Sequence, residues 1–438
     1  MGLREYDDKH TADATADIIL ELATDYNFLT NIGFCMADNA KDMHATVSKL
    51  SGKLSRLGIT YNAAYNRLRC SGHIINLSGK SFFFGRTEAT GRKIPGRLPE
   101  KEEELNRLTE VQWRDFGCFG RLHNIIIYIN NSPQHLKRFK VHSGGLGLRR
   151  DNKTRWNSWY IAINWALRPD INRALKEFCA EEKDLKDDEL RTYEWNQLAD
   201  IHQFLKPFWE ATKETEGIND TVDKILPMMD GLLAHLEHSS KATYADNDFM
   251  KERVWDAWKK LGEYYTLSDS TIAYFAATVL NPCAKYSYFQ QTWTTDLLRN
   301  AFKTNKKRLL ELYETYCDQF SEAQKDYNTD PQSTSNQPAS QSSKALFWAS
   351  RMKPPKKPKD ELQLYLSEPL YPEQECWHPI KWWLEESNQR RFPILSRLAL
   401  DILSVPAMSS STERFFSDAK LTIGPLRMKL LATTIEAL

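Results

Sequence analysis

The sequence lacks the features that mark several large classes of protein. No apolar run approaches the ~18 residues that a membrane-spanning helix needs, and the densest run, IIIYI, covers only residues 125–129. The first ten residues, MGLREYDDKH, have no secretion-signal character. There is no Walker-type glycine loop, no G-x-S-x-G nucleophile turn and no H-E-x-x-H zinc motif. These absences predict a soluble, intracellular chain outside the enzyme classes that use those motifs.

The cysteine count and the net charge restrict the possibilities further. The seven cysteines are odd in number and irregularly spaced, which predicts free thiols in a reducing compartment rather than a disulfide framework. They stand at positions 35, 70, 118, 179, 283, 317 and 376. The formal net charge is only +1, so nucleic-acid binding would need local basic patches. The 13 tryptophans suit either buried cores or stacking surfaces.

The chain of 438 residues is longer than one core usually supports, so we expect two or more subdomains. The first third reads as α/β, with a helix over 11–26 that Thr11 caps, a strand over 32–37, and helices over 43–57 and 69–85. From about 160 to 325 the apolar periodicity is helical almost throughout. The polar stretch 328–344 and its basic, proline-rich continuation predict a linker, after which amphipathic helix returns.

Asp38 directly follows the predicted strand IGFCMA, and two roles are open for it. Functional groups gather at the carboxyl ends of strands in open α/β sheets, which is where a metal ligand would lie. An Asp in this position also commonly caps the following helix. The local sequence alone favours the cap.

Glu413 presents a similar choice. Ser410-x-x-Glu413 matches a capping box, in which the glutamate hydrogen-bonds back to the amide of the capping residue. A catalytic carboxylate could occupy the same place. The local sequence again favours the structural role.

Three further motifs are weaker. Cys70 and His73 have a zinc-like spacing but no second pair nearby, so packing or an orienting hydrogen bond is the better interpretation. Arg155 beside Trp156 suits phosphate contact and base stacking, although a helix start with a buried tryptophan is the simpler reading. The segment KPPKKPK (353–359) fits a nuclear-import or nucleic-acid patch and fits a solvated linker equally well.

Taken in order, these segments resemble the transposases of the hAT superfamily, in particular its fungal branch. The resemblance covers nearly the whole chain, and the ordered set is specific although each piece alone is weak. It rests on GLREYDDKHTADATADIILELATDYN, IGFCMADNAKD, LRCSGHIINLSGKSFFFG, LHNIIIYINNSPQHLKRF, KTRWNSWY, LSEP and FPILSRLALDILSVPAMSSSTERFFSDAK.

The resemblance implies an α/β plus all-α fold, in which a partial RNase H-like catalytic core is interrupted by a large helical insertion domain. The family's chemistry is DNA cleavage and strand transfer by two divalent metals, Mg²⁺ or Mn²⁺, held by an Asp-Asp-Glu triad. The implied domains are the partial core at 1–160, the insertion at 161–327, a disordered linker at 328–360, and a C-terminal dimerisation region at 361–438 that completes the core.

The resemblance also assigns roles to single residues. Asp38 matches the family's second aspartate and Glu413 its glutamate, which overturns the local preference for both and makes them metal ligands. Trp156 matches an aromatic side chain that stacks on a flipped base, and Arg155 would contact phosphate. Cys70 and His73 match a CxxH pair near the active site.

The implied partners are DNA and a second copy of the chain, in the nucleus, with no membrane and no small-molecule substrate. The apolar residues of the C-terminal region would form a seam that serves dimerisation or simply closes the chain's own core. They are Trp382, Trp383, Phe392, Leu395, Leu398, Ile402, Phe415 and Phe416.

Some family features are missing from the sequence. The family's first aspartate lies upstream of the GLRE segment, no BED-type zinc finger precedes it, and Asp7 and Asp8 are poor substitutes. A sheet without its first strands should have an unpaired edge. We therefore expect a truncated or domesticated transposase remnant that dimerises and binds DNA without strand transfer. The alternative is a partial product of an active DDE transposase.

Overall fold

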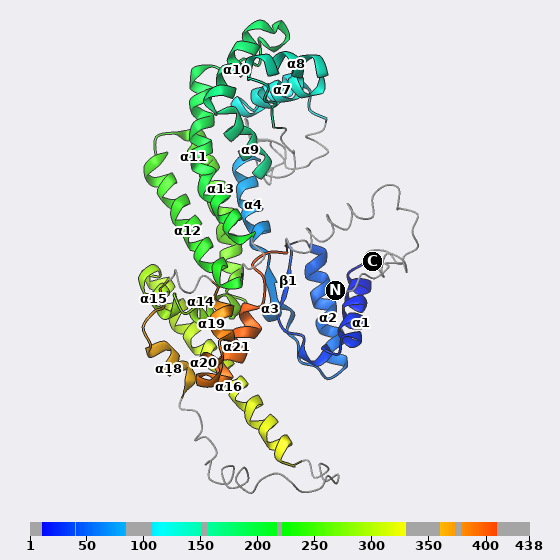
Figure 1. Ribbon diagram of the computed structural model, residues 1–438, viewed down its shortest axis with the longest axis vertical. Coiled ribbons are helices and arrows are strands. Elements are labelled where there is room, and N and C mark those ends of the chain that lie inside the picture. The colour runs from blue at the N-terminus through cyan, green and yellow to red at the C-terminus, as the bar shows by residue number, and fades with distance from the viewer. Residues whose placement is uncertain are drawn as a thin grey trace, which may run out of the picture.

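The computed structural model describes residues 11–39, 41–84, 107–149, 156–216, 221–329, 360–372 and 378–409. These residues are predominantly helical, with one small parallel sheet (Figure 1). The described residues form an upright column of helices, a compact group at its base and a small N-terminal unit beside the sheet.

The N-terminal unit places two helices beside the sheet. Its elements are α1 (Ala12–Asp25), η1 (Leu29–Asn31), β1 (Cys35–Ala37), α2 (Lys41–Arg56), α3 (Ala63–Asn66) and β2 (Arg67–Arg69). The side chain of Thr11 accepts the amide N–H of Ala14 at 3.3 Å, which confirms the predicted cap. Helices α1 and α2 pack on each other around a small core that includes Ala16, Val47 and Leu54.

The sheet is parallel, with Cys35 opposite Arg67 and Ala37 opposite Arg69. The predicted strand over 32–37 is confirmed in its last three residues. The predicted helix over 69–85 begins at Ser71 instead, because β2 occupies the residues before it. Two strands of three residues do not establish an RNase H-like sheet, so that fold stays a prediction.

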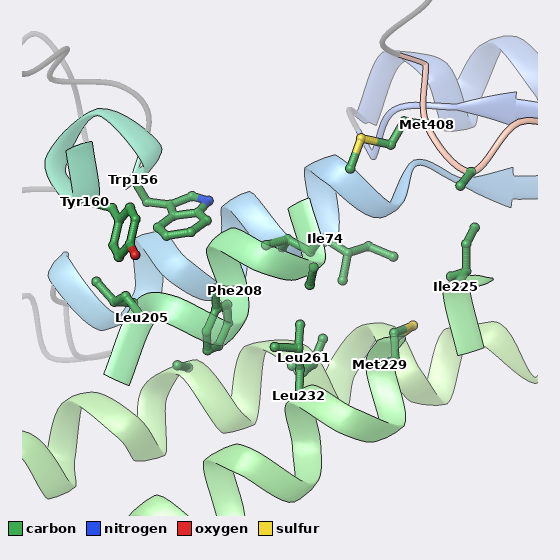
Figure 2. Close-up of a cluster of buried hydrophobic side chains, with 14 of the residues drawn as sticks. Ile74, Trp156, Tyr160, Leu205, Phe208, Ile225, Met229, Leu232, Leu261 and Met408 are labelled. Atoms are coloured by element: carbon green, nitrogen blue, oxygen red, sulfur yellow. The ribbon is translucent and has the colours of Figure 1, made fainter. Parts of the chain in front are cut away.

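The column is built around helix α4 (Ser71–Phe83), which buries one wide face, from Ser71 through Ile75 and Gly79 to Phe83. It packs against the helices of the predicted insertion, so the α/β part and the helical part share one hydrophobic core (Figure 2). The helices in direct contact with α4 are α9 (Trp156–Ala166), α11 (Thr192–Thr215) and α13 (Asp248–Ser268). Helix α12 (Ile225–His238) and the π-helical turn η4 (Ser239–Thr243) pack in turn on α13.

The top of the column is closed by shorter helices. They are α6 (Glu110–Arg114), α7 (Cys118–Asn131), α8 (Pro133–His142), α10 (Pro169–Glu181) and η2 (Lys183–Leu185). Arg114 holds this end together through two parallel hydrogen bonds of 2.9 and 2.8 Å to the buried carboxylate of Asp188. The helix predicted to stop near Pro169 ends at Ala166, and Pro169 begins the next one, where its missing N–H is not needed.

The base joins the end of the insertion to the C-terminal region. Its elements are η3 (Val222–Lys224), α14 (Ala273–Leu280), α15 (Lys285–Thr292), α16 (Asp296–Thr329), α18 (Glu361–Ser367), α19 (Pro379–Leu384), α20 (Glu386–Arg391) and α21 (Pro393–Leu403). The helical prediction for 160–325 is confirmed, and α16 runs two residues into the predicted linker. The rest of that linker, 330–359, lies outside the described residues.

Candidate functional site

The site begins where the two strands end. The backbone N–H of Cys70, the residue after β2, donates to the carbonyl oxygen of Ala37 at 3.0 Å. Helix α4 therefore starts directly beside the end of β1. Asp38 is the residue that follows β1, and its side chain is half-buried. The local geometry places Asp38 at the carboxyl edge of the sheet, as the sequence predicts.

A segment from the far end of the described chain reaches the same place. Both the backbone N–H and the hydroxyl of Ser71 donate to the carbonyl oxygen of Ala407, at 3.1 and 2.8 Å. The backbone N–H and the hydroxyl of Ser409 each donate to the sulfur of Cys70 at 3.4 Å. Met408 lies against the start of α4 at the sheet end of the buried cluster (Figure 2).

The insertion holds the same segment from its other side. The backbone N–H of Val222 donates to the carbonyl oxygen of Val405 at 3.1 Å, and Thr221 forms a β-bridge with Pro406. Residues 405–409 are therefore fixed between the helical base and the first turn of α4. Three segments that are far apart in sequence, 35–39, 67–73 and 405–409, meet at one point.

Two arginines lie at this meeting point, and the sequence reading did not single them out. Arg67 and Arg69 belong to β2, and their guanidinium groups reach residues Asp38 and Asn39. Burial lowers the pKa of Arg67, and the positive charge of Arg69 lowers it further. The alternation Arg-Leu-Arg is the sequence pattern of this strand, but three residues are too few for an alternating pattern to be recognised.

The described residues do not complete a metal site by themselves. No three His, Cys, Asp or Glu side chains in the described ranges lie close enough together to hold a metal ion. Glu413, the predicted partner of Asp38, lies outside the described residues, four positions after Ser409. Coordination of Mg²⁺ or Mn²⁺ by Asp38 and Glu413 stays a prediction.

Cys70 is buried and its sulfur accepts hydrogen bonds from Ser409, while His73 is half-buried in the first turn of α4. The contact of Cys70 agrees with the packing or orienting role that the local sequence favours. It ties the C-terminal segment to the end of the sheet.

Trp156 is fully buried, in the core between α4, α9 and α11 (Figure 2). Its ring lies so close to Gly79 of α4 that a methyl group there would come within 2.7 Å of Cγ. Stacking on a flipped base would require the indole to leave this packing, so that role stays a prediction. Arg155 lies outside the described residues.

The described part of the predicted C-terminal seam lies inside the chain's own core. Each of these side chains is at most 4% exposed: Trp382, Trp383, Phe392, Leu395, Leu398 and Ile402. The indole N–H of Trp383 donates to the carbonyl oxygen of Leu280 at 2.7 Å, which ties α19 to α14. These six side chains therefore close the chain's own core, which is one of the two predicted roles. Phe415 and Phe416 lie outside the described residues.

A cleft of about 770 Å³ opens elsewhere, between α11, α12 and α15. Its lining includes Glu210, Glu214, Met228 and Tyr371, and it does not include Asp38 or Cys70. Among the helices of the described ranges, none combines the length and apolarity that a bilayer crossing requires.

Comparison with known proteins gives a consistent set of relatives. Residues 361–438 match the family model of the hAT family C-terminal dimerisation region. The whole chain is 24% identical to part of a Talaromyces stipitatus protein named as a candidate transcriptional regulator, tpeD, and 20% identical to part of a Zea mays protein named as a candidate AC transposase. A zinc finger BED domain-containing protein of Arabidopsis thaliana is 22% identical over 66% of this chain and 40% of its own length.

The chain covers 49% of the Talaromyces protein and 51% of the maize protein. It thus spans about half the length of the relatives that it matches along its whole extent.

Proposed function

We propose that this chain, whose residues 361–438 match the hAT family C-terminal dimerisation region and whose relatives include a candidate transposase, forms a homodimer that binds DNA without carrying out strand transfer by itself. The proposal includes action in the nucleus, for which the basic segment 353–359 would serve as the import signal. Relatives named as a transposase and as a transcriptional regulator both support work on DNA.

One observation carries the DNA-binding part. The end of β1, the start of α4 and residues 405–409 meet, although Ser71 and Ala407 are 336 positions apart. These are the segments in which the family resemblance puts its active-site residues.

The proposed lack of strand transfer rests on the number of metal ligands. A two-metal mechanism needs enough carboxylate oxygens to hold both cations about the reacting phosphate. Asp38 and Glu413 of this chain match two of the family's three carboxylates. When metal is bound, it would activate the attacking oxygen and stabilise the leaving one. The chain's own groups are proposed to bind and orient DNA.

The dimer contact is proposed to use side chains that are exposed rather than the buried seam. Large apolar side chains exposed in the described part of the C-terminal region are Leu364, Leu370, Tyr371 and Leu384, at 41–55%. Exposed apolar groups of this size are typical of interfaces when they gather on one face. The buried seam would then support this surface from inside.

Two measurements test the proposal. Light scattering on the purified chain should give the mass of a dimer that dissociates on dilution, and a labelled DNA duplex should bind with an affinity that falls steeply with salt. A monomer at all concentrations, or no DNA binding at low salt, would contradict the corresponding half.

The meeting of Asp38 with the segment that leads to Glu413 also favours a second candidate, an active DDE transposase of which this chain is a part. Incubation of the chain with a supercoiled plasmid and Mg²⁺ or Mn²⁺ separates the two. Robust metal-dependent nicking that Asp38→Ala abolishes would establish the second candidate and overturn the first.

A further inference from the structure

Two guanidinium groups lie on one face of β2 at the end of the sheet. Side chains alternate along a strand, so Arg67 and Arg69 share a face while Leu68 points into the core with no exposed surface. A terminal nitrogen of Arg67 donates to the backbone carbonyl oxygen of Asp38 at 2.9 Å. A terminal nitrogen of Arg69 donates to Oδ1 of Asn39 at 3.3 Å.

The site contains donors that are not used. Arg67 is only 6% exposed, yet its Nε–H has no acceptor among the residues that the structure describes. The side-chain amide nitrogen of Asn39 is likewise buried without a partner in those residues. An unmet buried donor is costly, and more so when it carries charge. Two such donors at the end of this sheet leave room for an acceptor that the described residues do not supply.

The charge balance points to an anion. Arg67 and Arg69 interact unfavourably with each other, and Asp38 is the acidic side chain that interacts favourably with Arg67. The hydroxyl of Tyr274 accepts the backbone N–H of Arg69 at 2.7 Å, so a neutral residue occupies that side of β2. An anionic ligand would relieve the repulsion between the two guanidinium groups and accept the unused N–H groups.

We propose that Arg67, Arg69 and the side-chain amide of Asn39 form a phosphate-binding site at the carboxyl end of β1, and that the phosphate is a backbone phosphodiester of DNA. The planar, forked N–H groups of arginine match phosphate oxygens in geometry as well as charge. This inference rests on the proposed DNA binding and names the residues that would make the contact next to Asp38.

A purely structural role for Arg67 is already visible, because it ties the two strands together through Asp38. Arg69 is the sharper probe, since its bond goes to a side chain and it is half-buried. Arg168 is a matched control: it is also half-buried, its loss removes one positive charge, and it lies at the α9–α10 junction where it pairs with Asp170.

The experiment measures binding of a fluorescein-labelled DNA duplex by anisotropy across a salt series. We expect Arg69→Gln to weaken binding about tenfold and to lower the slope of log K against log salt by about one, as loss of one phosphate contact does. Arg69→Lys should recover part of the affinity, and Arg168→Gln should behave as wild type. Asn39→Ala gives a second, uncharged test of the same site, with a smaller loss of affinity.

The outcomes separate this inference from the proposed function. Wild-type affinity and slope in both Arg69→Gln and Asn39→Ala, with DNA binding intact in the parent, would overturn the phosphate site and leave the proposed function standing. If the parent does not bind DNA, the proposed function fails. A rise in thermal stability with inorganic phosphate that Arg69→Gln removes would then assign the site to free phosphate compounds and overturn the DNA contact.

Discussion

The Nζ atom of Lys285 lies 2.6 Å from the backbone carbonyl oxygen of Tyr365, eighty positions later in the chain. The same ammonium group donates to the carbonyl oxygen of Glu368 at 3.0 Å and sits 4.4 Å from the centre of the Tyr365 ring. Lys285 is buried, and its backbone adopts a positive φ of 48°. A charged side chain thus caps the carbonyl groups at the end of α18, the first helix of the C-terminal region.

Lys285→Met should lower the free energy of unfolding by about 2–3 kcal/mol, because hydrogen bonds from a charged donor are strong and the carbonyls at the end of α18 would lose theirs. Urea denaturation measures the change. Lys306→Met, which removes an exposed lysine lying 5.0 Å from the Tyr286 ring, is the control and should change stability by less than about 1 kcal/mol. Equal effects of the two substitutions would refute the capping role.

Asp230 should give the protein a distinct pH response. Its carboxylate accepts from Tyr265 and Tyr288 at 2.6 and 2.7 Å, and from the indole of Trp293 at 3.1 Å. Burial raises the pKa of Asp230 above its ordinary value of 3.8 in spite of these bonds. The folded protein therefore binds the proton at higher pH than the unfolded chain, and stability from this group rises as pH falls through the raised pKa.

The measurement is the unfolding free energy of the wild type minus that of Asp230→Asn, determined from pH 7 to 4. This difference should become more positive on acidification, because only the wild type gains stability by binding the proton. Asp170 is the matched control, because hydrogen bonds from Arg168 lower its pKa. The difference between wild type and Asp170→Asn should stay flat over this range and fall only below it. A flat profile for Asp230→Asn would show that its pKa is not raised.

Gly79→Ala should destabilise the protein by about 1–3 kcal/mol, because the added methyl group would press on the ring of Trp156 inside a packed core. Gly52→Ala is the control, since it lies within α2 and has no atom within 4 Å of the added methyl group. That change should stabilise by about 0.5–1 kcal/mol through helix propensity. Chemical denaturation of both variants tests the pair, and a tolerated Gly79→Ala would mean that the indole readily moves.

Leu384→Ser and Leu395→Ala should separate the surface of the C-terminal region from its core. Leu384 is 55% exposed, so its loss should leave unfolding almost unchanged while raising the dimer dissociation constant. Leu395 is fully buried, and truncation should cost about 2–5 kcal/mol. Light scattering and calorimetry on both variants decide the matter. A dimer as tight as the parent's in Leu384→Ser would remove this side chain from the interface.

The sequence reading succeeded where signals are local. Apolar periodicity located the helices of the column, and Thr11 was correctly read as a cap from its side-chain type and position. Prediction from the sequence failed where an element is only a few residues long or where the partners lie far apart in the chain. The predicted helix over 69–85 includes Arg69, which in the structure ends strand β2, because three residues show no recognisable alternation.

Trp156 illustrates a different limit. A tryptophan beside a charged residue at a helix start is compatible with a core and with a stacking surface, and only the approach of Gly79 shows that the ring is enclosed. The contacts of Ser71 with Ala407 could not be derived from pattern either, because no local property of either residue encodes a partner 336 positions away.

That long-range closure also governs how the molecule can be made. During synthesis Ser71 leaves the ribosome long before Ala407 is added to the chain. The hydrogen bonds from Ser71 to Ala407 at the first turn of α4 can therefore form only after most of the chain has been made. During that interval the place that Met408 will fill beside Gly72 is open. Nascent chains halted before residue 405 should consequently engage chaperones, and release should follow only when the closing segment has emerged.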